Sequence, residues 1–162
     1  MPLTCAFSGH RPEKLPWGED ESDPRCQALK IQMERALRTL CQEGCTRFLC
    51  GMARGTDLYY FEVLERLREE FPLTVEAVVP CPSQSESWPR EQQLRYLRDL
   101  GRCDRTTVLE EHYSEGCMLR RNRYMVEQAD VLLTVFDGSP GGTAATVRYA
   151  RARGLRIVSL WR

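Results

Sequence analysis

Two turns rich in glycine and charged residues carry the clearest chemistry in this sequence. The stretch DGSPGGTAATVRYA covers residues 137–150 and directly follows the apolar run VLLTVF. Gly141 and Gly142 allow close backbone approach, and a helix beginning near Thr143 would present free N–H groups and the positive end of its dipole to an anion. The stretch therefore predicts a phosphate-binding turn, although a tight strand-to-helix connection alone also needs glycine.

The stretch GMARGTD repeats this pattern earlier in the chain. Gly51 and Gly55 supply backbone freedom, and Arg54 carries a planar, permanently charged group that suits an anion. Thr56 and Asp57 can cap the following helix or contact the same ligand. If both turns meet at one crevice, they form two walls of an anion site.

The stretch SGHRP places Gly9, His10 and Arg11 just past the first apolar run. Arg11 is the strongest candidate for ligand contact, because a guanidinium keeps its charge in proteins. His10 is predicted to meet the ligand beside it. Trp17 and Trp88 each adjoin a proline in a predicted loop, where they could stack on a nucleobase or, as we favour, anchor the loop to the core.

The stretch LRRNRYM contains a polar residue in an apolar position. Asn122 lies four residues after Met118 and three before Met125, on the helix face that should be buried. A buried amide must be hydrogen-bonded, so Asn122 either ties neighbouring loops together or contacts the ligand. Both roles stay open, and the adjacent Arg121 joins the candidate site.

These residues need a scaffold, and the pattern of apolar residues predicts one. Short apolar runs alternate with amphipathic segments, which is typical of a parallel sheet flanked by helices. The fold class is therefore α/β, a Rossmann-like three-layer α/β/α arrangement with a mostly parallel central sheet. The run at 131–136 is apolar on both faces and should be a central strand. The predicted strands cover residues 4–8, 46–50, 73–79, 106–109, 131–136 and 155–160.

The predicted helices follow a period of 3.6 residues. They cover residues 29–41, 58–71 and 118–129, with a shorter one at 90–100, and Gly44 and Gly154 are expected as left-handed C-caps. Residues 12–25 and 81–92 are predicted to be loops. Nearly all the glycine-rich and polar turns follow strands, so they should gather at the carboxyl edge of the sheet, where open α/β sheets bind ligands.

Composition narrows the class of protein. The 162 residues suit one domain over 1–162, with 42% hydrophobic and 28% charged residues. Twenty-three basic residues balance 23 acidic ones, which argues against nucleic acid as a partner. No run is long enough to span a membrane, so a cytoplasmic protein is expected. The eight cysteines are scattered without a CxxC pair, which predicts no metal site.

Together, SGHRP, GMARGTD and RRNRYMVEQADVLLTVFDGSPGGTAATVRYA resemble the YoqJ/YpsA-like family of the SMF/DprA and LOG (SLOG) superfamily. The resemblance implies a Rossmann-like fold and a nucleotide or nucleotide-derived ligand. GMARGTD is similar to the GxARGxD turn of DprA-type members, which bind single-stranded DNA. The last block resembles the LOG enzymes, which remove a phosphoribosyl group from cytokinin nucleotides. Arg121 and Met125 match that enzyme pattern, but Asn122 replaces its lysine and Thr146 its glutamate, and threonine cannot act as a carboxylate base.

The sequence thus predicts binding of a nucleotide or related phosphorylated ligand, in a sensing or regulatory role, with no obligatory cofactor. One alternative is N-glycosidic hydrolysis of a nucleoside monophosphate, with Asp57, Asp137 or Glu115 as the carboxylate and no catalytic residue assigned. Another is a non-catalytic module that contacts an unidentified protein partner. Related folds commonly self-associate, so a homo-oligomer stays open.

Overall fold

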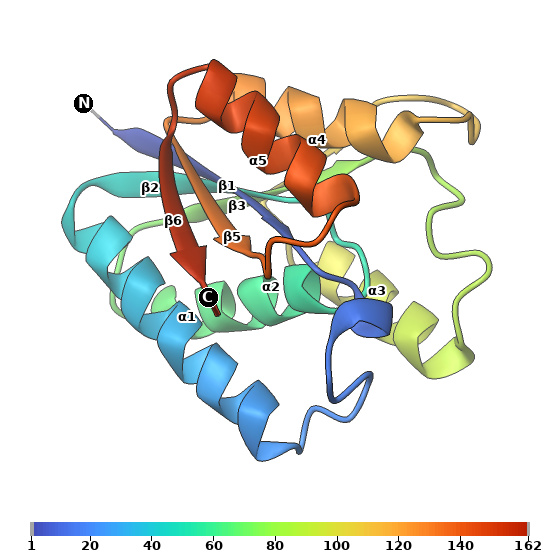
Figure 1. The fold of residues 1–162 in the computed structure, drawn as a ribbon, viewed down its shortest axis with the longest axis horizontal. Helices are drawn as coiled ribbons and strands as arrows, with labels where there is room; N and C mark the ends of the chain where they lie inside the picture. Colours follow the sequence, from blue (N-terminus) through green and yellow to red (C-terminus); the bar gives the residue numbers. More distant parts are fainter. Residues whose placement is uncertain (1, 162) are drawn as a thin grey trace.

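The computed structural model describes residues 2–161 and is built on one six-stranded sheet (Figure 1). All five strand pairings are parallel, and the strand order is β4-β3-β2-β1-β5-β6. This is the Rossmann-like α/β arrangement that the alternating apolar pattern predicts. The strands are β1 (Leu3–Gly9), β2 (Cys45–Cys50), β3 (Thr74–Val79), β4 (Arg105–Val108), β5 (Val131–Val135) and β6 (Arg156–Leu160).

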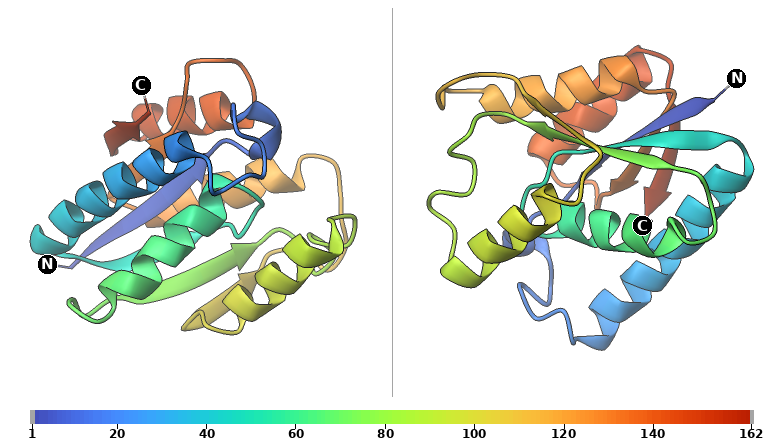
Figure 2. Two further views of the ribbon diagram at one scale, coloured as in Figure 1. Left: turned by 90° about the horizontal axis from the view of Figure 1, so that it is seen from below. Right: turned by 180° about the vertical axis from the view of Figure 1, so that it is seen from behind.

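Helices cover both faces of the sheet, which gives three layers (Figures 1 and 2). One layer contains α1 (Pro24–Gln42), α2 (Thr56–Leu67) and α3 (Arg90–Leu100), and the other contains α4 (Cys117–Gln128) and α5 (Gly142–Ala152). A short 3-10 helix, η1 (Pro12–Lys14), follows β1. Strand β5 lies in the interior of the sheet, between β1 and the edge strand β6, and it is buried along its whole length, as its apolar sequence predicts.

The predicted strands are confirmed, and the differences lie at helix ends. The predicted loop over 12–25 is wrong at both ends, because it contains η1 and the first residues of α1. Asp23 caps α1 by accepting a hydrogen bond from the N–H of Arg25 at 2.8 Å, and Pro24 fits the first helical position. The short helix predicted at 90–100 is confirmed as α3, so the predicted loop over 81–92 ends before Arg90. The predicted left-handed C-caps are confirmed at Gly44 and Gly154, with φ of +107° and +80°.

The order of the strands creates a crevice beside β1. From β1 the chain builds outward through β2, β3 and β4 in one direction, and β5 and β6 lie in the other. The connections after β1 and after β5 therefore enter helices on opposite faces of the sheet, and a gap opens between them. The glycine-rich turn before α5 and the SGHRP stretch both end at this point.

Two global properties complete the description. All eight cysteines are free thiols, and six of them are buried. Within residues 2–161, every helix is too short or too polar to cross a membrane.

Candidate functional site

A cavity of about 450 Å³ occupies the crevice beyond the carboxyl ends of β1 and β5. Its wall comes from four segments: the end of β1 with the residues that follow it, the turn after β2 with the start of α2, the first turns of α4 and the glycine turn that starts α5. The cavity thus brings together loops that are far apart in the sequence. Its lining residues are Ser8, Gly9, His10, Arg11, Glu13, Lys14, Ala53, Asp57, Met118, Leu119, Arg121, Asn122, Gly141, Gly142 and Thr143.

The N-terminus of α5 opens into this cavity without a cap. Gly141 is the N-cap with φ of +144°, it provides no side-chain hydrogen bond, and the first turn of α5 has no acidic residue. The first N–H groups of a helix have no partner inside the helix, so they remain available to a ligand. Thr143 is only 8% exposed, and within residues 2–161 its hydroxyl makes no hydrogen bond. An anion here would meet both kinds of donor.

Lys14 adds a positive charge to the same turn. Its Nζ donates hydrogen bonds to the carbonyl oxygen of Pro140 at 2.6 Å and to the hydroxyl of Ser139 at 3.1 Å. Gly141 has a φ of +144°, which favours glycine, and a Cβ there would lie 2.8 Å from this Nζ, so a larger residue would also displace the lysine. Sequence reasoning missed Lys14, because it lies in a stretch predicted to be a loop. The sequence feature that could have pointed to Lys14 is its position three residues after the candidate Arg11.

Arg11 lines the cavity as an uncommitted cation. Its side chain is exposed and, within the described chain, forms neither an ion pair nor a hydrogen bond. Arg11 and Lys14 therefore both present positive charge to the ligand space. The buried hydroxyl of Ser8, which the sequence did not single out, also lines the cavity.

His10 is buried beneath the cavity and connects the turns that surround it. It is 2% exposed, and its Nε2 lies 3.0 Å from Asp137 Oδ1, to which it donates when protonated, and 3.2 Å from the backbone nitrogen of Asp137. Its carbonyl oxygen accepts hydrogen bonds from the N–H and the hydroxyl of Thr56. Hydrogen bonds from Ser139, and then from His10, hold the pKa of Asp137 well below its usual range. His10 thereby joins the turns after β1, β2 and β5.

Asp57 and Arg121 form the charged floor of the cavity. Asp57 is 7% exposed, and one of its oxygens accepts the N–H of Ala53 at 3.0 Å. Burial raises the pKa of Asp57 and lowers the pKa of Arg121. The guanidinium of Arg121 donates to the carbonyl oxygens of Gly51 at 2.5 Å and Val78 at 3.3 Å, so most of its hydrogen bonds are structural.

Asn122 connects α4 to α5 and also faces the cavity. Its oxygen accepts from Arg121 Nε at 2.9 Å, and its nitrogen donates to the hydroxyl of Thr146 at 3.0 Å. Thr146 in turn donates to the carbonyl oxygen of Gly142 at 2.9 Å. Asn122 therefore ties neighbouring segments together, and its place in the cavity wall leaves ligand contact as a second role. Thr146, at the carboxylate position of the LOG pattern, is bound within the protein.

Four predicted site residues lie outside the wall of this cavity. Arg54 pairs with Glu13 at 2.7 Å and Glu19 at 3.4 Å, and it lines a neighbouring groove instead. Thr56 is fully buried against His10. The glycines serve close packing: a Cβ at Gly51 would lie 2.6 Å from Arg121, and one at Gly55 would lie 2.9 Å from the carbonyl oxygen of His10. These four residues support the site through packing and pairing and do not line the cavity.

The two tryptophans lie in different environments. Trp17 is buried and donates a hydrogen bond to the hydroxyl of Tyr59 at 3.0 Å, so it anchors its loop to the core. Trp88 is only partly buried and lines the neighbouring groove.

Fold and site together define a Rossmann-like α/β protein with a cavity of mixed polar and apolar lining at the switch point of its sheet. The family model described as the YspA SLOG family matches residues 5–154, so the chain belongs to this family. A UPF0398 protein of Bacillus licheniformis is 31% identical over 142 residues, which cover 83% of this chain and 77% of the relative. The SPbeta prophage-derived protein YoqJ of Bacillus subtilis is 28% identical over 154 residues, covering 86% and 90%.

Solved structures agree on the fold. DNA processing protein A from Helicobacter pylori, which binds single-stranded DNA, superimposes with a TM-score of 0.65 at 17% identity. The same protein from Streptococcus pneumoniae gives a TM-score of 0.65 at 12% identity. Both comparisons cover 98% of this chain, which spans 65% and 50% of the length of those two proteins.

Proposed function

We propose that this protein binds a nucleotide or a nucleotide-derived phosphorylated small molecule in the cavity at the carboxyl edge of its sheet, in a sensing or regulatory role. The observation that carries the proposal is the uncapped start of α5, where free N–H groups, the Thr143 hydroxyl and the Lys14 ammonium converge on one space. This combination of donors suits a phosphate group.

The remaining walls suit the rest of a nucleotide. A cavity of about 450 Å³ lies within the usual range for small-molecule sites. Met118 and Leu119 supply apolar contact for a base, and Asp57 offers a carboxylate oxygen to a ribose hydroxyl. Arg11 balances the ligand's second negative charge.

The proposal predicts different results for two variants at one position. A Cβ at Gly142 meets no atom within 4 Å, and an acidic residue in the first turn of a helix stabilises it, so Gly142→Asp should keep the fold. Its carboxylate would stand beside the ligand phosphate. We expect Gly142→Asp to weaken AMP binding by at least about thirtyfold in isothermal titration calorimetry, because like charges in contact cost several kcal/mol.

Gly142→Asn is the matched control, since it has nearly the same size without the charge. It should lose much less affinity for AMP, while circular dichroism shows both variants folded. Equal losses for Asp and Asn would contradict a phosphate at this position. Failure of wild-type protein to bind any of AMP, GMP, CMP and UMP would contradict the proposed function.

Asp57 supports a second candidate function, N-glycosidic hydrolysis. Of the three carboxylates considered from the sequence, only Asp57 lines the cavity, and its raised pKa favours proton transfer. Water would add its hydroxyl to C1′ and, through Asp57, its proton to the departing base, giving free base and ribose 5-phosphate. Release of base from AMP by wild type and not by Asp57→Asn would support this reaction. No release at saturating protein would leave binding as the function.

A further inference from the structure

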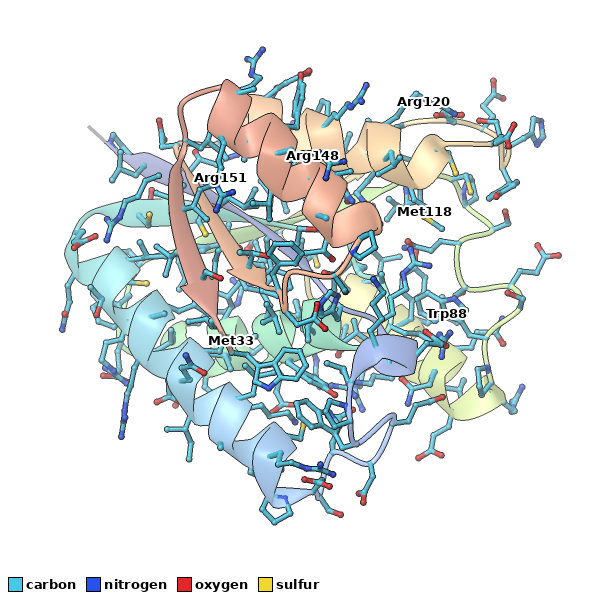
Figure 3. The ribbon with its side chains drawn as sticks, viewed as in Figure 1. Met33, Trp88, Met118, Arg120, Arg148 and Arg151 are labelled. Atoms are coloured by element: carbon cyan, nitrogen blue, oxygen red, sulfur yellow. The ribbon has the colours of Figure 1, made fainter. Side chains whose placement is uncertain are left out.

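A second hollow adjoins the cavity and has no role in the proposed function. This groove of about 460 Å³ lies between the loop after β3 and the loop after β4. Arg11 and Met118 belong to the walls of both hollows, so the two spaces adjoin at these side chains. Figure 3 shows Met118 and Trp88 on the same side of the molecule, near the starts of α4 and α3. A ligand longer than a mononucleotide could therefore extend from the cavity into the groove.

Two aromatic side chains line the groove. The ring of Trp88 packs edge-on against Tyr96, with centroids 5.2 Å apart and planes at 75°, so its orientation is fixed from behind. Tyr113 lies on the opposite loop and is 67% exposed, a large aromatic surface left to solvent. Aromatic side chains on opposite walls of a groove suit a flat ring, because stacking is favourable for every nucleobase.

Charge favours one compact anion at the junction. Arg54 faces the groove, but Glu13 and Glu19 already pair with it. Arg11 is left as the cation without a partner in the groove's described wall, and it stands where the groove meets the cavity. Glu86 adds negative charge to the groove. A single diphosphate near Arg11 would fit this pattern, because Arg54 is already paired and Glu86 repels further negative charge in the groove.

We propose that the groove binds a second planar ring of the same ligand, joined through a diphosphate that Arg11 contacts. This inference rests on the proposed function and narrows the ligand to molecules that carry two ring systems on one diphosphate. The first nucleotide occupies the cavity with its phosphate at α5, and the second ring lies between Trp88 and Tyr113.

The test compares AMP with diadenosine diphosphate by isothermal titration calorimetry. Wild-type protein should bind diadenosine diphosphate at least about tenfold more tightly than AMP, which corresponds to one stacked base. Tyr113→Ala changes an exposed side chain and should remove most of this difference while leaving AMP affinity unchanged. Trp88→Ala should do the same, and Trp88→Phe should retain the difference because it keeps a ring.

Three results would overturn the inference. Equal affinity of wild type for the two probes would mean that the groove contributes nothing. A loss of AMP affinity in Tyr113→Ala as large as the loss for diadenosine diphosphate would place the first nucleotide in the groove. Tighter binding of oligothymidylate than of diadenosine diphosphate, lost in Tyr113→Ala, would make single-stranded DNA the occupant. Failure of wild type to bind any of AMP, GMP, CMP and UMP would instead reject the proposed function.

Discussion

At the scale of single residues, the hydrogen bonds that Asp137 accepts from Ser139 and His10 make stability depend on pH. The pKa of Asp137 is held low by hydrogen bonds from Ser139 and by His10, so the folded state favours its ionised form. A depressed carboxyl pKa gives stability that is present above the unfolded pKa of about 3.9 and is lost as pH falls through the folded pKa. The turn before α5 should therefore loosen in acid.

Asp137→Asn tests this dependence. We expect wild type to melt at a higher temperature than Asp137→Asn at pH 7 and at pH 5, and the difference to shrink steadily below about pH 4. Thermal unfolding followed by circular dichroism between pH 7 and pH 3 measures it. A difference that stays constant over this range would show that the charge of Asp137 plays no part.

Glycine at position 51 should be needed for packing. A Cβ there would lie 2.6 Å from Arg121 Nη1, and the hydrogen bonds of Arg121 to backbone carbonyls prevent it from moving aside. Gly51→Ala should lower the free energy of unfolding by about 1–3 kcal/mol, measured by urea denaturation. Gly142→Ala is the control, because its Cβ meets open space and the helix start accepts alanine. Equal stability of the two variants would reject this packing role.

The residue types in the sequence predicted which loops form the cavity. They did not predict which side chains pair with one another there. The chain after β1 and the turn before α5 could be predicted to meet because both follow strands of one parallel sheet. The pairing of Arg54 with Glu13 and Glu19 could not, since it joins segments 41 and 35 residues apart through side-chain contacts. The contact of Lys14 with Pro140 spans 126 residues and was equally hidden.

At the scale of elements, Arg121 connects α4 to the ends of β2 and β3. Its buried guanidinium donates hydrogen bonds to the carbonyl oxygens of Gly51 and Val78, and these bonds from a charged donor would be lost without Arg121. Arg121→Met should therefore cost about 2–3 kcal/mol of unfolding free energy in urea denaturation. Arg123→Met, on the exposed side of the same helix, should cost less than about 1 kcal/mol. Similar losses for both would mean that α4 is held by its apolar face alone.

The helices and strands themselves were predictable, because apolar residues recur at a regular spacing along each helix and form short runs in the strands. Their ends depended on capping, which the apolar period does not encode. Asp23 and Pro24 start α1 before its first apolar residue in the predicted segment, and α2 ends at Leu67, four residues before Phe71. Phe71 still packs against the core from the following turn. An apolar residue that continues the helical spacing can therefore be buried although the helix has already ended.

At the scale of the whole molecule, a net charge of zero hides an uneven distribution. Exposed arginines gather on the outer side of α4 and α5, and Figure 3 shows Arg120, Arg148 and Arg151 on this side. Arg123 and Arg153 lie over the ring of Tyr149 at 5.3 and 5.8 Å from its centroid. The balance of 23 basic and 23 acidic residues, used against nucleic acid in the sequence analysis, therefore does not describe this face.

This arginine face leads to a prediction about single-stranded DNA that separates it from the cavity. Surface cations bind phosphate backbones by releasing counterions, so such binding weakens steeply with salt. We expect a fluorescent oligothymidylate to bind wild type at about 20 mM salt and to lose at least about tenfold in affinity at about 150 mM, measured by anisotropy.

Gly142→Asp should leave this binding unchanged because the cavity lies beside the start of α5, away from the outer arginines. Replacing Arg148 and Arg151 with glutamate should remove it. Binding that survives 150 mM salt and is lost in Gly142→Asp would mean that DNA itself occupies the cavity, and that the likeness to the DNA processing proteins extends from the fold to the ligand.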